Sequence, residues 1–160
     1  MMSWPFPQES AHPMVVHFPI ALLLTAVGVD LGALLAGRPG LHRIALWNLA
    51  LGTLAALLAV WTGLRAAEVA KHTFEIHQII TLHERLGKIT AILACMVVGV
   101  RLAKRDRLTS RVRAVTMLLA LMMTATLVWG AHLGGRLVYE FGVGGRFGTS
   151  TSIPTTSHHH

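Results

Sequence analysis

The stretch that decides the fold is "VVHFPIALLLTAVGVDLGALL", Val15 to Leu35, in which His17 and Asp30 are the only ionisable side chains. At about 1.5 Å of rise per residue such a helix is roughly 30 Å long, which is the thickness of a bilayer's hydrocarbon core. Three further apolar stretches have a similar length, namely Ile44 to Leu64, His83 to Leu102 and Ala114 to Leu133. The sequence therefore predicts an all-α integral membrane protein with four spans.

Composition supports a lipid environment. Of the 160 residues, 53% are hydrophobic and 13% charged, whereas soluble domains carry about 25% charged residues. The net charge of +7 is expected to orient the chain in the membrane and not to bind nucleic acid. Cys95 is the single cysteine, which excludes a disulfide framework within one chain.

Short connections predict an up-down four-helix bundle. "AGRPGLHR" joins the first two spans and "AKRDRLTSRVR" joins the last two, so each pair forms an antiparallel hairpin. The middle link, residues 65–81, is polar and free of proline, and it is expected to extend the second or third span as helix. Pro13 favours an extended backbone at His12. Gly134 and Gly135 are read as a helix stop.

These boundaries divide the chain into four parts. Residues 1–14 form an N-terminal extracytoplasmic segment and residues 15–135 the transmembrane domain. Residues 136–157 form a Gly-rich C-terminal tail, and residues 158–160 are a probable tag remnant.

Charge asymmetry predicts the orientation. The first and third loops carry almost only cations, with Asp106 as their one acid: Arg38, Arg43, Arg101, Lys104, Arg105, Arg107, Arg111 and Arg113. Cytoplasmic loops of membrane proteins are enriched in Lys and Arg. Both termini and the middle loop are therefore expected outside the cytoplasm.

Three histidines are predicted to share one level. His17 lies 21 positions from Arg38, His83 lies 18 from Arg101 and His132 lies 19 from Arg113, or roughly 27 to 32 Å along each helix. This level is the outer rim of the hydrocarbon core, where the three imidazoles could meet around a metal or a haem iron.

Three alternatives stay open: a haem, a bound metal ion, or no cofactor. A b-type haem needs two imidazoles, and His17 with His83 is the expected axial pair because the first and third spans are diagonal. His132 is the substitute, Gly87 gives space, and Arg85 and Arg136 are expected near the propionates. Zinc or copper would use His17, His83 and His132 with His12, His72 or Glu75. In a cofactor-free structural subunit, the histidines would only be tolerated at the interface.

Two other features of the first span carry predictions. A buried carboxylate must be paired or protonated, so Asp30 is expected to pair with Arg43 or Arg101. Gly28, Gly32 and Ala36 are spaced four apart, which permits close helix contact and favours a homodimer.

The motifs "HPMVVHFPIALL", "TLHERLG" and "GAHLGGRLVYEFGVG" resemble the bacterial membrane family catalogued as domain of unknown function 2231, over about residues 11 to 145. The matching residues are His12, Pro13, His17, Phe18, Pro19, His83, Gly134, Gly135, Leu137, Val138, Tyr139 and Gly142, with His132 as the histidine of the last span. Some members of that family are joined to Rieske-type or c-type cytochrome domains, so the resemblance implies electron transfer in a bacterial cytoplasmic membrane.

The residues and the resemblance together favour a b-type cytochrome-like protein that exchanges electrons with the quinone pool and an extracytoplasmic redox partner. Such a chain is an electron carrier or redox subunit more than a stand-alone enzyme. It has no C-x-x-C-H motif, so a covalently bound haem would belong to a partner.

Overall fold

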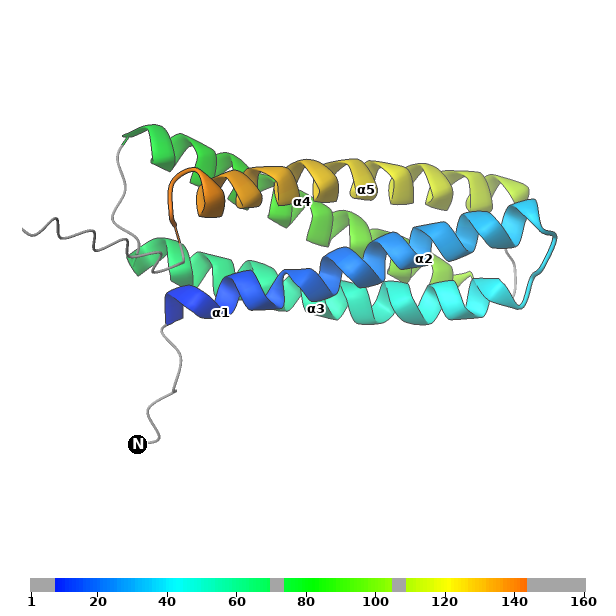
Figure 1. Cartoon of the computed structure of the whole chain (residues 1–160). Helices are drawn as coiled ribbons and strands as arrows, with labels where there is room; N and C mark the ends of the chain where they lie inside the picture. The colour runs from blue at the N-terminus through cyan, green and yellow to red at the C-terminus, as the bar shows by residue number, and fades with distance from the viewer. Residues whose placement is uncertain (1–7, 70–73, 105–108, 144–160) are drawn as a thin grey trace, which may run out of the picture.

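A computed structural model describes residues 8–69, 74–104 and 109–143, and within these ranges all regular structure is helical. The helices are α1 (Gln8–Val15), α2 (His17–Leu35), α3 (Leu41–Val69), α4 (Phe74–Ala103) and α5 (Ser110–Tyr139). Figure 1 shows α1 running into α2, and the long helices lying side by side in alternating directions. Four segments are long and apolar enough to cross a membrane, with His12–Leu35 counted as one. The predicted all-α four-span bundle is confirmed.

The four long helices form a ring in which each packs on two neighbours. α2 packs on α3 and α5, and α4 also packs on α3 and α5. Among the described residues no Cα atom of α2 lies within 8 Å of one in α4. The first and third spans are thus diagonal, as expected from the short connections.

The first span is a kinked helix with proline on both sides of the kink. Pro13 lies inside α1, so the expected extended backbone at His12 is wrong. Proline fixes φ near its helical value and removes only its own N–H bond, and a helix tolerates this loss close to its beginning. Pro19 cannot donate to the carbonyl of Val15, where α1 ends, while Val16 keeps a helical backbone (φ −63°, ψ −22°).

The ends of the other spans differ from the expected boundaries in two ways. The polar middle link extends both α3, to Val69, and α4, from Phe74. α5 continues through Gly134 and Gly135 to Tyr139, so the predicted stop is wrong and residues 136–139 are helix, not tail. A glycine ends a helix where it adopts a left-handed backbone, and that occurs later, at Gly142 (φ +65°).

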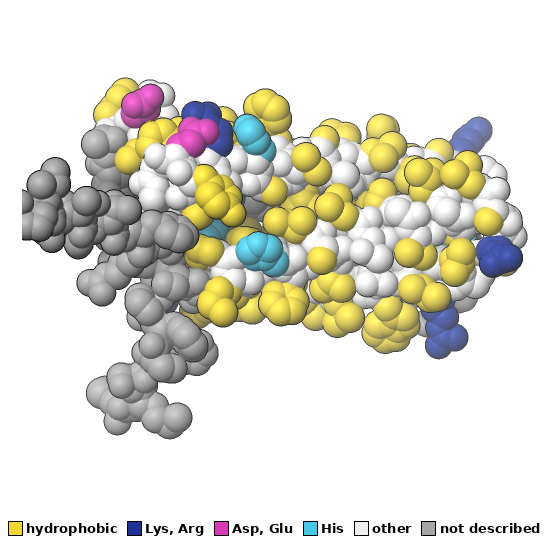
Figure 2. Space-filling view, in the orientation of Figure 1, with side chains coloured by type: hydrophobic (Ala, Val, Ile, Leu, Met, Phe, Trp, Pro, Cys, Tyr) yellow, Lys and Arg dark blue, Asp and Glu magenta, His cyan; other side chains and the backbone are white. Residues whose placement is uncertain are grey.

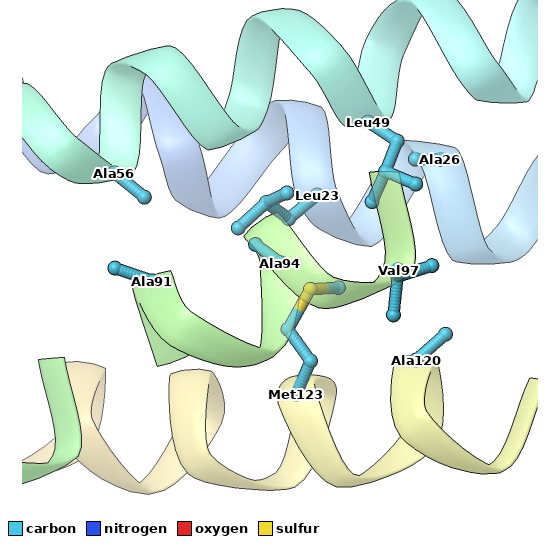
Figure 3. Close-up of a cluster of buried hydrophobic side chains, with 9 residues drawn as sticks. All are labelled: Leu23, Ala26, Leu49, Ala56, Ala91, Ala94, Val97, Ala120 and Met123. Atoms are coloured by element: carbon cyan, nitrogen blue, oxygen red, sulfur yellow. The ribbon is translucent and has the colours of Figure 1, made fainter. Parts of the chain in front are cut away.

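The core is built mainly from small side chains. Figure 3 shows Leu23 and Met123 among alanines of the other helices, and the two side chains are fully buried. Small residues let helix backbones approach closely, which drives helix packing in membranes. The cluster consists of Leu23, Ala26, Leu49, Ala56, Ala91, Ala94, Val97, Ala120 and Met123.

Large apolar side chains cover the outside of the bundle instead. Figure 2 shows them along the length of the visible face, with Lys and Arg at the end where α2 meets α3. Examples are Leu54, Ile92 and Leu118, each about 60% exposed (64%, 59% and 60%). An apolar exterior of this extent fits contact with lipid tails.

Candidate intramembrane histidine site

Two histidines meet inside the bundle at the end opposite the α2–α3 turn. The ring centroids of His12 in α1 and His83 in α4 are 6.0 Å apart, and the ring planes are inclined by 78°. Both side chains are part-buried. We call this arrangement the histidine pair.

Each ring is held through Nδ1. His83 Nδ1 lies 2.8 Å from the carbonyl oxygen of Gly130, and a carbonyl only accepts, so this nitrogen carries the proton. His12 Nδ1 lies 3.2 Å from the hydroxyl oxygen of Thr62. That hydroxyl donates to the carbonyl of Ala59 (3.0 Å), so its oxygen accepts from His12. Both rings therefore have the tautomer with a lone pair on Nε2, which is the usual arrangement of metal-binding histidines.

Glycines on neighbouring helices make room for both rings. A Cβ atom added to Gly63 in α3 would lie 2.9 Å from Cε1 of His12. One added to Gly134 in α5 would lie 3.0 Å from Cε1 of His83. The imidazoles thus lie directly against helix backbone, and any larger residue at these two positions would push them away.

The histidine pair differs from the expected pair of His17 and His83. His17 is exposed, because it lies five positions from His12 and an α-helix turns about 100° per residue. His132 is also exposed and lies beside Trp129, with 6.0 Å between ring centroids. It falls between Gly130 and Gly134 in sequence, and these two face His83, so its side chain projects from the opposite side of α5.

The residues predicted to lie beside a haem also differ in whether they face the interior of the bundle. Gly87 lies one turn from His83 on the inner face of α4, where its added Cβ would meet Val60 of α3 at 3.9 Å. Arg85 is exposed and lies about 200° around α4 from His83. Arg136 binds Glu140, four positions on in the chain, with Nη2 2.9 Å from Oε2, and this contact holds the pKa of Glu140 below its usual value.

Further metal ligands do not gather at the pair. Glu75 is exposed in the first turn of α4, and His72 lies outside the described residues. In the described part of the chain, no group of three or more His, Cys, Asp or Glu side chains is close enough to hold a metal ion. Thr62 and Gly130, which fix the two rings, were not anticipated from the sequence.

A second polar group lies at the other end of the bundle. Asp30 in α2 is 3% exposed and its carboxylate binds the guanidinium of Arg101 in α4. His42 Nδ1, at the beginning of α3, lies 2.7 Å from the other carboxylate oxygen. The expected ion pair of Asp30 is confirmed with Arg101 as the partner, and His42 joins it.

The fold and this site define a class: a multi-span α-helical membrane protein with an internal histidine pair near one end. The chain belongs to the family of domain of unknown function 2231, described as a predicted membrane protein, whose model matches residues 8–146. No curated protein and no solved structure matches the chain.

Proposed function

We propose that this membrane protein carries electrons through a b-type haem bound by His12 and His83. The observation that carries the proposal is that two part-buried imidazoles from diagonal segments lie together, each with Nδ1 bonded and a lone pair on Nε2. Bundle interiors commonly hold cofactors on facing helices in this way. A haem iron changes oxidation state by one electron, which is the chemistry the group would supply.

The number of ligands favours haem over zinc. Structural zinc sites use four protein ligands and catalytic sites three, whereas a haem iron needs only axial ligands from the protein. The described residues bring two imidazoles together and no third ligand. The donor atoms therefore suit an iron whose remaining ligands come from a porphyrin.

Space for the ring depends on α1. The two imidazoles are in edge contact, so a flat macrocycle enters only if α1 shifts away from α4. No Cα atom of α1 lies within 8 Å of α4 or α5 among the described residues. Since α1 also packs on α3, and His12 bonds Thr62 there, such a shift would have to slide α1 along α3 or break this bond.

A second candidate is a metal-binding membrane protein, with zinc or copper on the same two histidines. Its support is that a bare ion, unlike a macrocycle, needs no wide space between the two rings. Their centroids are 6.0 Å apart, roughly the separation of two imidazoles on one ion with bonds of about 2.0–2.1 Å. The third ligand would come from residues such as His72. If neither haem nor metal binds, the chain is a cofactor-free structural subunit.

The experiment is a reduced-minus-oxidised visible spectrum of purified protein expressed with haem available, with a pyridine hemochrome assay and metal analysis of the same sample. Haem in the wild type, lost in His12→Ala and His83→Ala, is the expected result. His17→Ala and His132→Ala are matched controls, because both histidines are exposed at a similar level. Metal without porphyrin overturns the haem in favour of the second candidate, and a sample with neither overturns both.

The physiological setting follows from the same proposal. By the positive-inside rule we expect the end with the α2–α3 turn to face the cytoplasm, and the histidine pair would then lie near the outer face of a bacterial cytoplasmic membrane. Quinone within the bilayer and an extracytoplasmic redox protein are then the partners within reach. The homodimer stays a prediction, and an added Cβ on Gly28 or Gly32 would meet nothing within 4 Å in the chain.

A further inference from the structure

Five exposed cations gather at the end of the bundle remote from the histidine pair. They lie in the α2–α3 turn, in the first turn of α3, directly after α4 and in the first turn of α5, and we call this surface the basic end. Figure 2 shows dark blue side chains there. Its members are Arg38, Arg43, Lys104, Arg111 and Arg113, all exposed.

These cations have no ion-pair partner among the described residues. The ion pairs of the described chain are Asp30 with Arg101 and His42, Glu84 with Lys88, and Glu140 with Arg136. The last two pairs lie toward the histidine end and neutralise charges there. At the basic end, by contrast, the described residues provide no counter-charge for the exposed cations.

Among the described residues, the one acidic side chain near this end forms its ion pairs inside the bundle. Asp30 is buried and its two carboxylate oxygens bind Arg101 and His42, so it does not offset the exposed cations. Residues 105–108 lie outside the described residues, and their sequence, with Arg105, Asp106 and Arg107, has a net charge of +1. A ligand for the basic end must therefore be anionic.

Apolar side chains flank the cations and indicate where this anion lies. Ile44 is 51% and Trp47 63% exposed on α3, next to Arg43 and one turn beyond it. Leu35 and Leu102 are exposed beside the other cations (81% and 54%). Trp at such a position marks the level of lipid headgroups, with acyl chains on its apolar side.

We propose that the basic end binds anionic phospholipid, with phosphates on the five cations and acyl chains on the flanking apolar side chains. Clusters of four to eight Lys and Arg next to membrane helices are typical of anionic-lipid recognition. The inference does not depend on a cofactor at the histidine pair. A double-stranded nucleic acid would use the cations alone, and a single strand could stack bases on Trp47 but would leave the aliphatic side chains Leu35, Ile44 and Leu102 without a role.

The test is native mass spectrometry of the full chain with phosphatidylglycerol or phosphatidylcholine added in equal amounts. We expect tighter retention of phosphatidylglycerol, and about a fivefold loss of affinity for each cation replaced by Gln. Raising the salt from 0.05 to about 0.5 M should weaken the binding, because salt screens charges near a surface.

The matched control removes equal charge at the other end. Arg38→Gln with Arg43→Gln is compared with Arg65→Gln with Arg85→Gln, whose arginines are exposed near the histidine end. Loss of phosphatidylglycerol in the first pair alone supports the proposal. Equal loss in both pairs, equal retention of the two lipids, or displacement by millimolar inorganic phosphate alone overturns it. Tighter binding of an oligonucleotide than of phosphatidylglycerol overturns it as well. Helical circular dichroism of each variant checks that it is folded.

Discussion

The carboxylate of Asp30 and the guanidinium of Arg101 form an ion pair across the diagonal of the bundle, between helices that share no backbone contact. The histidine pair joins the same diagonal at the opposite end, through α1 and α4. Two polar contacts thus connect the first and third spans, one near each end of the membrane. Between them the diagonal is filled by the apolar core.

Breaking the Asp30 contact should destabilise the bundle strongly. Asp30→Asn leaves Arg101 buried, with 12% of its side chain exposed, and without a counter-charge. Removing one partner of a buried pair costs about 3–5 kcal/mol. Denaturant unfolding in detergent, followed by circular dichroism, measures this change in the free energy of unfolding.

The control is an exposed pair. Lys88→Gln removes the partner of Glu84, and both side chains are at least 31% exposed, so the change should be below about 1 kcal/mol. The double variant Asp30→Asn with Arg101→Gln should recover part of the loss. Equal effects at the two sites would show that Asp30 is not held in a low-dielectric interior.

A methyl group at Gly134 should disturb the histidine pair. Its Cβ would lie 3.0 Å from Cε1 of His83, and this ring cannot swing away without losing its bond to Gly130. We expect Gly134→Ala to lower the free energy of unfolding by about 1–3 kcal/mol, the usual effect of overpacking.

The adjacent glycine is the control for helix propensity. An added Cβ at Gly135 would meet nothing within 4 Å, so Gly135→Ala should stabilise α5 by about 0.5–1 kcal/mol. Chemical unfolding of both variants under one set of conditions compares them. A stabilised Gly134→Ala would mean that His83 does not occupy this position in solution.

Substitutions at Leu23 and Gly52 should compensate each other, because a smaller side chain at one position makes room for a larger one at the other. Leu23 is fully buried, and a Cβ on Gly52 would lie 2.8 Å from its Cδ2 atom. Leu23→Ala should cost about 2–5 kcal/mol through the cavity it leaves, and Gly52→Ala should be unfavourable through overpacking. The double variant should be more stable than the sum of the two changes predicts, and simple additivity would contradict the contact.

Orientation is testable with single cysteines. In a Cys95→Ser background, Glu140→Cys should react with a membrane-impermeant maleimide in intact cells. Lys104→Cys should react only after permeabilisation, because we expect the basic end inside. The reverse pattern would put the histidine pair on the cytoplasmic side.

The span count was predictable because hydrophobic length is a local property of the sequence. Each span had enough consecutive apolar residues, and each connection was short enough to force an antiparallel neighbour. The failure at Gly134 has a physical reason. A glycine ends a helix where it adopts a left-handed backbone, whereas Gly134 and Gly135 keep a helical backbone and His83 lies against Gly134.

The common level of the three histidines stays a prediction, and the inward-facing side of the first span was not predicted. Counting residues from the basic loops gives the height of each histidine along its helix. The face on which it lies depends instead on the spacing of the inward-facing residues. Buried residues of α2 follow a seven-residue spacing, with Pro19, Ala26 and Ala33 in one set and Leu23 with Asp30 in the other. Extending the first set backwards reaches His12 and not His17. Asp30 had to face the interior to reach a partner, so its position around the helix was the feature of the sequence that indicated the inner face.

The apolar layer between the two polar ends keeps the two polar sites apart. Leu23, Val97 and Met123 fill this layer and are fully buried. The nearby hydroxyls of Thr53 and Thr116 donate to carbonyls of their own helices, so they pass no hydrogen bond onward in the described residues. Within the described residues, the Asp30 contact and the histidine pair are therefore two separate polar sites with packed apolar side chains between them.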